Sequence, residues 1–300
     1  MKKGFSRAGL NPSPSEHMHD NKTSISALYD SHVHWLMTGE KKSYFDIQKY
    51  RCLSDIAPSD FQPQNYRGGW IFGFGWTDSQ LVNANGLKDV DRLSPTSPLC
   101  FIKKDAHSCL LNSAALKHIL PHIENVPTLQ PFIERDSSGA LTGVLKESAF
   151  YSIYAHIPAL SPSEIRRCLL VAQDYFLDNG FTHIRDMTCS MPQWSVLKDM
   201  QKNGELKVVA DINFNAETSS HALETLIPFA LLERATKYRN LNIQGIKIFS
   251  DGSLGSNTAW LFENYKGTKQ NGIGLWSNED MLSVMKQCWQ NSLEFSVHAL

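Results

Sequence analysis

The second half of the sequence alternates between segments with helical periodicity and short segments rich in strand formers, and this alternation constrains the fold most. The clearest helix start is Ser161-Pro162-Ser163-Glu164, with a capping serine, proline at the first helical position and glutamate at the third. Apolar residues then recur on one face as far as Leu177, and Asn179-Gly180 supplies a left-handed terminator. A strand-like segment follows at 181–186.

The same alternation continues to the end of the chain. We expect helices at 193–203, 221–238 and 277–291, and strands at 206–213, 243–250 and 294–298. Residues 25–34 are short, rich in strand formers and end in polar residues, so we expect them to form the first strand. Repeated units of this size predict a parallel sheet covered by helices, with the active site at the carboxyl ends of the strands.

Two other regions do not share this pattern. Residues 1–24 are polar and without periodicity, which predicts a disordered arm. Residues 44–155 contain a glycine-rich stretch, proline-punctuated turns and a strand-like segment at 99–102, which predicts an inserted α+β subdomain. We therefore expect the first strand and its following loop in 25–43, and the remaining strand-helix units in 156–300.

Charge and cysteine content narrow the class of function. Twenty-nine basic and thirty acidic residues give a net charge of −1, so no overall field attracts nucleic acid or an anionic membrane. No apolar run reaches the length of about twenty residues that a bilayer requires. The six cysteines contain no CxxC pair, which favours reduced thiols and a cytoplasmic location. We expect a small-molecule partner, with a homodimer as an open alternative.

The first strand ends in His32 and His34, whose spacing places both side chains on one face of a strand. Two neutral imidazoles at fixed separation are good ligands for zinc-like cations, and Asp30 or a backbone carbonyl would orient the rings. The alternative is that both are ordinary surface or core histidines. The pair therefore indicates a metal site without proving one.

Two further strands carry a candidate ligand. Lys247 lies in an apolar strand, where loss of solvation favours the neutral amine, and this amine can react with carbon dioxide to give a carbamate that bridges two metals. The alternative is a lysine on the outer face or paired with a carboxylate. His298 ends the last strand, although it could be a core histidine. Together, three strands place potential ligands at the same end of the sheet.

Several segments in order resemble the amidohydrolase superfamily, specifically the amidohydrolase 3 branch with YtcJ-like proteins and N-substituted formamide deformylase. The barrel segments that carry the resemblance are 30–34, 180–187, 245–255 and 297–299, and those in the insertion are 70–76, 104–108, 112–116 and 143–147. The resemblance covers residues 29–300. The ordered series makes it specific.

The resemblance implies a (β/α)8 TIM barrel with about five of its strands in this chain, and one or two divalent metal ions, expected to be zinc. It implies that His32 and His34 bind the more buried metal, that Lys247 is a carboxylated bridge, and that His298 binds the second metal. Lys247 and His298 would thus act in catalysis. The substrate-binding residues implied are Asp105, His107, Trp76 and Asp251, although His107 could be a plain loop histidine and Asp251 a turn former.

The implied reaction is hydrolysis of a carbon-nitrogen bond in an amide or N-formyl or N-acyl amine by metal-activated water. This chain departs from the family pattern because Thr77 follows Trp76, which displaces the usual acid to Asp78. It also shows neither the β-sandwich ahead of the first strand nor the later histidine and general-base aspartate. We therefore expect an incomplete barrel with little activity on its own.

Two other classes of function stay open. The first is a truncated, catalytically inactive amidohydrolase-like binding or partner module. The second is a non-metal α/β enzyme that seats a phosphate on the backbone amides of 252–256, although the GxxxxGK[ST] phosphate-binding loop is absent from the sequence.

Overall fold

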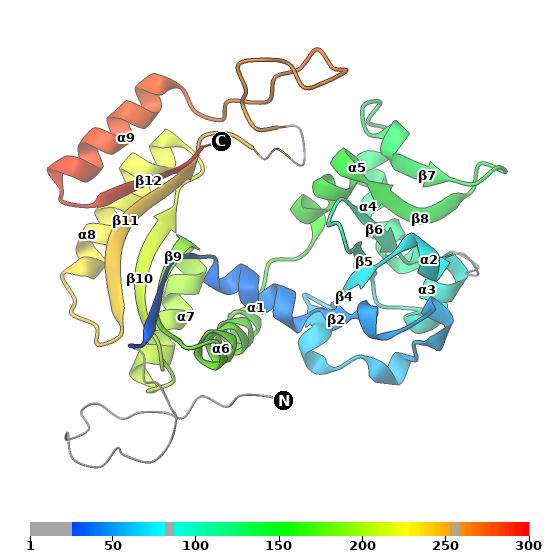
Figure 1. Ribbon diagram of the computed structural model, residues 1–300, viewed down its shortest axis with the longest axis horizontal. Coiled ribbons are helices and arrows are strands. Elements are labelled where there is room, and N and C mark those ends of the chain that lie inside the picture. Colours follow the sequence, from blue (N-terminus) through cyan, green and yellow to red (C-terminus); the bar gives the residue numbers. More distant parts are fainter. Residues whose placement is uncertain (1–25, 82–86, 253, 255–257, 300) are drawn as a thin grey trace. The chain divides into compact units, whose positions relative to one another are not determined.

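The computed structural model describes residues 26–81, 87–252, 254 and 258–299. The predicted arm at 1–24 lies outside these ranges. The chain divides into two compact units, drawn in Figure 1. Of the described residues, the parallel-sheet unit contains 26–36, 169–249 and 276–298, and the mixed-sheet unit contains 37–168 and 250–275. The boundaries at 44 and 155 inferred from the sequence stay a prediction.

The parallel-sheet unit is built on five strands in the order β1-β9-β10-β11-β12, every neighbouring pair parallel. These strands are β1 (Leu28–Val33), β9 (Phe181–Cys189), β10 (Val209–Asn215), β11 (Leu241–Phe249) and β12 (Glu294–His298). Spatial order follows chain order, and the sheet curls as in part of a barrel (Figure 1). The predicted parallel α/β sheet is confirmed.

The helices of the repeating units begin and end close to their sequence signals. They are α6 (Pro162–Asp178), α7 (Met191–Lys202), α8 (Ile227–Arg234) and α9 (Asn278–Gln290). Ser161 and Glu164 form the predicted capping box, and Gly180 has φ +86°. The expected helix at 221–238 is shorter, because a π-helical turn occupies His221–Leu226 and α8 ends at Arg234. None of the helices in the described ranges is long and apolar enough to cross a membrane.

The expected loop after the first strand is instead helix α1 (Trp35–Ser43). Its start lacks a local capping signal, but the Asp186 carboxylate accepts a hydrogen bond from the Trp35 backbone N–H at 3.3 Å. The Trp35 side chain is fully buried, and its indole N–H donates to the Leu169 carbonyl at 2.9 Å. Contacts from distant segments therefore supply the cap and the anchor that make this segment helical.

The mixed-sheet unit has strands in the order β2-β4-β5-β6-β8-β7, with β3 paired to β4. They are β2 (Phe45–Asp46), β3 (Tyr66–Arg67), β4 (Trp70–Trp76), β5 (Leu99–Lys103), β6 (Ser108–Leu111), β7 (Ile133–Arg135) and β8 (Leu141–Lys146). Its helices are α2 (Asp78–Leu81), α3 (Leu87–Leu93), α4 (Ser113–Ile123) and α5 (Glu147–Ser152). The β5-β6-β8-β7 part is antiparallel, and two hydrophobic clusters form the core.

Asn112 links two elements of this unit. Its fully buried side chain accepts hydrogen bonds from the backbone N–H groups of Leu99 and Ala115, both at 2.9 Å. Its amide group donates to the carbonyls of Ser94 and Ser97 at 2.6 and 2.9 Å. The residue thus caps α4 and at the same time holds the start of β5.

We expect Asn112→Ala to lower the free energy of unfolding by about 2–4 kcal/mol, because it leaves several buried groups without partners. Urea denaturation would measure the loss. The matched control is Asn291→Ala at the exposed end of α9, where one hydrogen bond to the Gln287 carbonyl is lost and we expect a change within about 0.5 kcal/mol. Equal losses in both variants would contradict this role of Asn112.

Candidate metal centre

His32 and His34 lie side by side at the carboxyl end of β1. Their ring centroids are 5.4 Å apart, and the ring planes cross at 73°. The Nδ1 atom of His34 is 2.9 Å from the Thr188 hydroxyl. Because Nδ1 is engaged in this way, Nε2 is the nitrogen through which His34 could bind a cation.

The group beside the His34 ring differs from the sequence expectation. Asp30 accepts a hydrogen bond from the His32 backbone N–H at 3.1 Å, whereas Thr188 contacts the His34 ring. Thr188 is held in turn by its backbone N–H, which donates to Asp186 at 3.1 Å. Neither Thr188 nor Asp186 is a site residue predicted from the sequence, although Asp186 lies inside the segment 180–187 that carries the family resemblance.

Asp186 is a fully buried carboxylate that ties β9 to the residues around His34. In addition to the N–H groups of Trp35 and Thr188, it accepts from the Gln193 amide at 2.6 Å. Burial raises the pKa of Asp186 to about 6, even though these hydrogen bonds favour the charged form. The carboxylate therefore fixes the backbone that follows His34.

Lys247 is buried in β11, with 2% of its surface exposed. Its neighbours Ile246 and Ile248 are fully buried, and strand alternation directs Lys247 to the opposite face from them. The ammonium group lies 5.0 Å from the centroid of the Phe249 ring, and burial lowers the pKa of Lys247. Within the described ranges, Lys247 has no carboxylate at ion-pair distance, so the alternative of a paired lysine lacks support.

His298 ends β12 directly opposite Phe249 of β11, and the two ring centroids are 5.2 Å apart. Burial lowers the pKa of both His32 and His34, and the positive charges of Lys247 and His298 lower it further. Lys247 and His298 therefore lie near enough to His32 and His34 to affect the pKa values of these two histidines.

The imidazole nitrogens of His32 and His34 are suitable ligands for a divalent cation, but they do not make up a complete ligand set. Lowered pKa values keep the imidazoles of His32 and His34 neutral, which is the form that binds metal. Among the residues that the structure describes, however, no three histidine, cysteine, aspartate or glutamate side chains lie close enough to hold an ion. A metal site here would therefore need at least one ligand besides two of these side chains.

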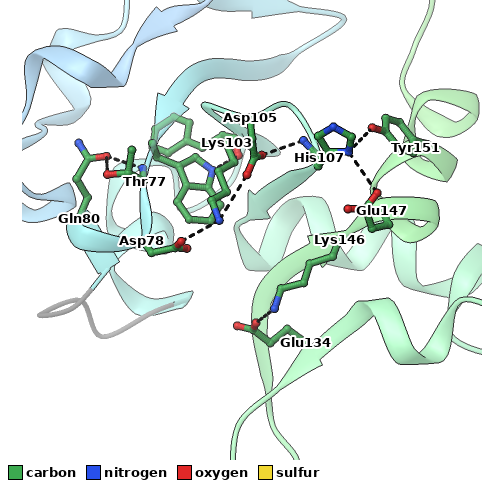
Figure 2. A network of polar contacts seen from close by, with 12 residues as sticks. Thr77, Asp78, Gln80, Lys103, Asp105, His107, Glu134, Lys146, Glu147 and Tyr151 are labelled. Atoms are coloured by element: carbon green, nitrogen blue, oxygen red, sulfur yellow. Dashed lines mark hydrogen bonds and ion pairs between the residues drawn. The ribbon is translucent and has the colours of Figure 1, made fainter. Parts of the chain in front are cut away.

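The structure places two of the expected substrate-binding residues together in a turn of the mixed-sheet unit, as Figure 2 shows. Asp105 accepts a hydrogen bond from the His107 backbone N–H at 3.0 Å. The His107 ring contacts Glu147 and Tyr151, which the sequence analysis did not identify. Lys103 is 2.9 Å from Asp78 and 3.7 Å from Asp105. Their contact with a substrate stays a prediction.

The other two expected substrate-binding residues have structural contacts of their own. Trp76 is 1% exposed in the hydrophobic core, and its indole N–H donates to the Phe101 carbonyl at 2.7 Å. Its contact with a substrate stays a prediction. Asp251 is 4% exposed and accepts from the Trp260 backbone N–H at 2.9 Å, which orders the segment after β11. Most of the candidate anion site at 252–256 lies outside the described residues.

A family model described as the amidohydrolase family matches residues 20–300. The chain belongs to this amidohydrolase family. The putative amidohydrolase YtcJ of Bacillus subtilis (strain 168) is 26% identical over 279 residues, covering 90% of this chain and 52% of YtcJ. The protein LONG AFTER FAR-RED 3 of Arabidopsis thaliana is 26% identical over 303 residues, covering 94% of this chain and 50% of that protein.

Solved structures support the fold of this amidohydrolase chain. An uncharacterized metal-dependent hydrolase from Pyrococcus furiosus superimposes with a TM-score of 0.69 at 23% identity, covering 91% of this chain and 55% of that one. Its counterpart from Pyrococcus horikoshii gives 0.65 at 21% identity, covering 91% and 53%. The chain spans about half the length of the curated relatives that it matches. The two solved structures thus support the fold of this chain.

Proposed function

We propose that this amidohydrolase hydrolyses a carbon-nitrogen bond in a small-molecule amide or in an N-formyl or N-acyl amine. The observation that carries the proposal is the buried Lys247, which has no carboxylate partner in the described ranges and lies on the same sheet as His32, His34 and His298. Burial of a lone lysine is costly, and titratable groups in such surroundings are common at functional sites. Membership of the family favours this enzyme over a non-catalytic module.

We propose His32, His34, Lys247 and His298 as the residues that hold one or two divalent cations, with zinc as the expected ion. His34 would bind through Nε2, because Thr188 occupies the other side of the ring. The neutral Lys247 amine would attack carbon dioxide, form a nitrogen-carbon bond and release one proton to solvent, which leaves an anionic carbamate oxygen as ligand. A cation bound there polarises a substrate carbonyl and lowers the pKa of water.

The proposal also covers the barrel, the residues that contact the substrate and the location of the protein. We propose that the curled sheet is part of a (β/α)8 barrel, and that Asp105, His107 and Asp251 contact the substrate. The six cysteines all have free thiols, which supports the proposed cytoplasmic location. The homodimer stays a prediction.

The test is hydrolysis of matched substrates by protein loaded with zinc, manganese or cobalt. We expect slow release of amine from a panel of N-formyl and N-acetyl amines, with loss of this activity on chelation and recovery when metal returns. Esters with oxygen in place of the amide nitrogen are the matched controls, and we expect slower turnover of these. Metal-loaded protein that releases no amine from any amide, or whose activity survives complete chelation, would contradict the proposal.

A further inference from the structure

Backbone pairing at one end of an antiparallel ladder brings His107 and Glu147 together. Ser108 of β6 pairs with Lys146 of β8, so His107, just before β6, and Glu147, just after β8, are the next pair along. The Glu147 backbone N–H donates to the His107 carbonyl at 2.8 Å. Two positions far apart in the sequence therefore have a fixed relative placement.

The residue before His107 and Glu147 itself adopt a backbone conformation that L-amino acids rarely take. Ala106 has φ 62° and Glu147 has φ 41°, although neither is glycine. Such residues cost of order 1 kcal/mol each and persist only where surrounding contacts hold them. With this backbone, the Glu147 side chain turns toward the His107 ring (Figure 2).

Both acceptors near the ring lie on the side of Nδ1. This nitrogen is 3.3 Å from Glu147 Oε2 and 3.1 Å from the hydroxyl of Tyr151, one helical turn further along α5. The Tyr151 hydroxyl donates to the Ala106 carbonyl at 3.4 Å, so it faces Nδ1 with a lone pair. A carboxylate can only accept. The arrangement therefore favours the proton of a neutral His107 ring on Nδ1.

The opposite edge of the ring is open to a ligand. The His107 side chain is 32% exposed, and Nε2 has no hydrogen-bond partner among the residues that the structure describes. With the proton on Nδ1, Nε2 carries a lone pair.

We propose that Glu147 is a positioning residue that holds the His107 proton on Nδ1, so that Nε2 accepts a hydrogen bond from an N–H or O–H group of a ligand. We take a primary or secondary amide as this ligand, and this choice rests on the proposed function. The position of the proton on the His107 ring does not depend on the proposed function.

Nitrogen-15 NMR of histidine-labelled protein measures the tautomer directly. We expect Glu147→Ala to shift the ratio of the two neutral tautomers about two- to tenfold toward Nε2–H, as expected for loss of one part-exposed hydrogen bond. Glu147→Gln keeps the side-chain volume and should shift the ratio in the same direction. The matched control is Glu134→Ala, which removes a carboxylate bound to Lys146 and Thr142 and should leave the ratio unchanged. An unchanged ratio in both Glu147 variants would overturn the positioning role.

The ligand class is tested with two small probes on the same labelled protein. We expect acetamide to shift the His107 Nε2 resonance saturably, and N,N-dimethylacetamide, which has no N–H, to bind at least about tenfold more weakly. Equal responses, or no saturable response to either probe, would overturn the acceptor role. The titration is repeated in a His32→Ala/His34→Ala variant, where we expect the same response, so failure here is distinguishable from failure of the proposed metal centre.

Discussion

Replacing His32 and His34 together by alanine is expected to abolish high-affinity binding of divalent metal. The two rings are 5.4 Å apart and supply the only adjacent imidazoles at the end of a strand within the described part of the chain. Loss of a single outer-shell partner typically costs about 10–100-fold in metal affinity, so loss of two direct ligands should cost more than about 100-fold. Elemental analysis after equilibrium dialysis against zinc would measure the effect.

A second histidine pair provides the control for this experiment. His122 and His156 stack with ring centroids 4.0 Å apart, but they lie in the mixed-sheet unit. Alanine at both positions removes the same number of imidazoles and should leave the metal content unchanged. Equal metal in the wild type and the His32/His34 variant would exclude these residues as ligands. Equal loss in both double variants would show binding to histidines in general.

Lys247→Met should make the metal-free protein more stable while it weakens metal binding. Lys247 is 2% exposed and lacks a described carboxylate partner, so its charged form loses solvation without an ion pair in return. Methionine has a similar length and no charge, and we expect a gain of about 1–3 kcal/mol in the free energy of unfolding. The metal content should fall, because no carbamate can form. Urea denaturation and elemental analysis of one preparation measure both effects.

The control for Lys247 is Lys198→Met, which removes a lysine that donates to Glu233 at 2.6 Å. That variant loses a favourable contact, so we expect its stability to fall slightly and its metal content to stay constant. Addition of bicarbonate should raise the metal affinity of the wild type and have no effect on Lys247→Met. A Lys247→Met protein that is less stable and still binds the full amount of metal would contradict the proposed role.

Local sequence signals predicted the elements of the parallel-sheet unit well. The capping box at Ser161 and Glu164 and the terminator at Gly180 act within a few residues, so the sequence alone reveals them. Helix α1 was missed because its cap comes from Asp186, which is 151 positions away. An aromatic side chain such as Trp76 packs equally well in a core or against a ligand, so the sequence alone does not reveal its burial.

The side chains available for chemistry can be read from the sequence: a histidine pair at the end of a strand, a lysine in an apolar strand and a histidine that ends the last strand. Their surroundings became known only from the folded chain: Thr188 contacts His34, Phe249 lies near both Lys247 and His298, and Glu147 contacts His107. The reason is physical. Periodicity and capping depend on neighbours along the chain, whereas strand register and side-chain packing join residues such as His34 and Thr188 across 154 positions.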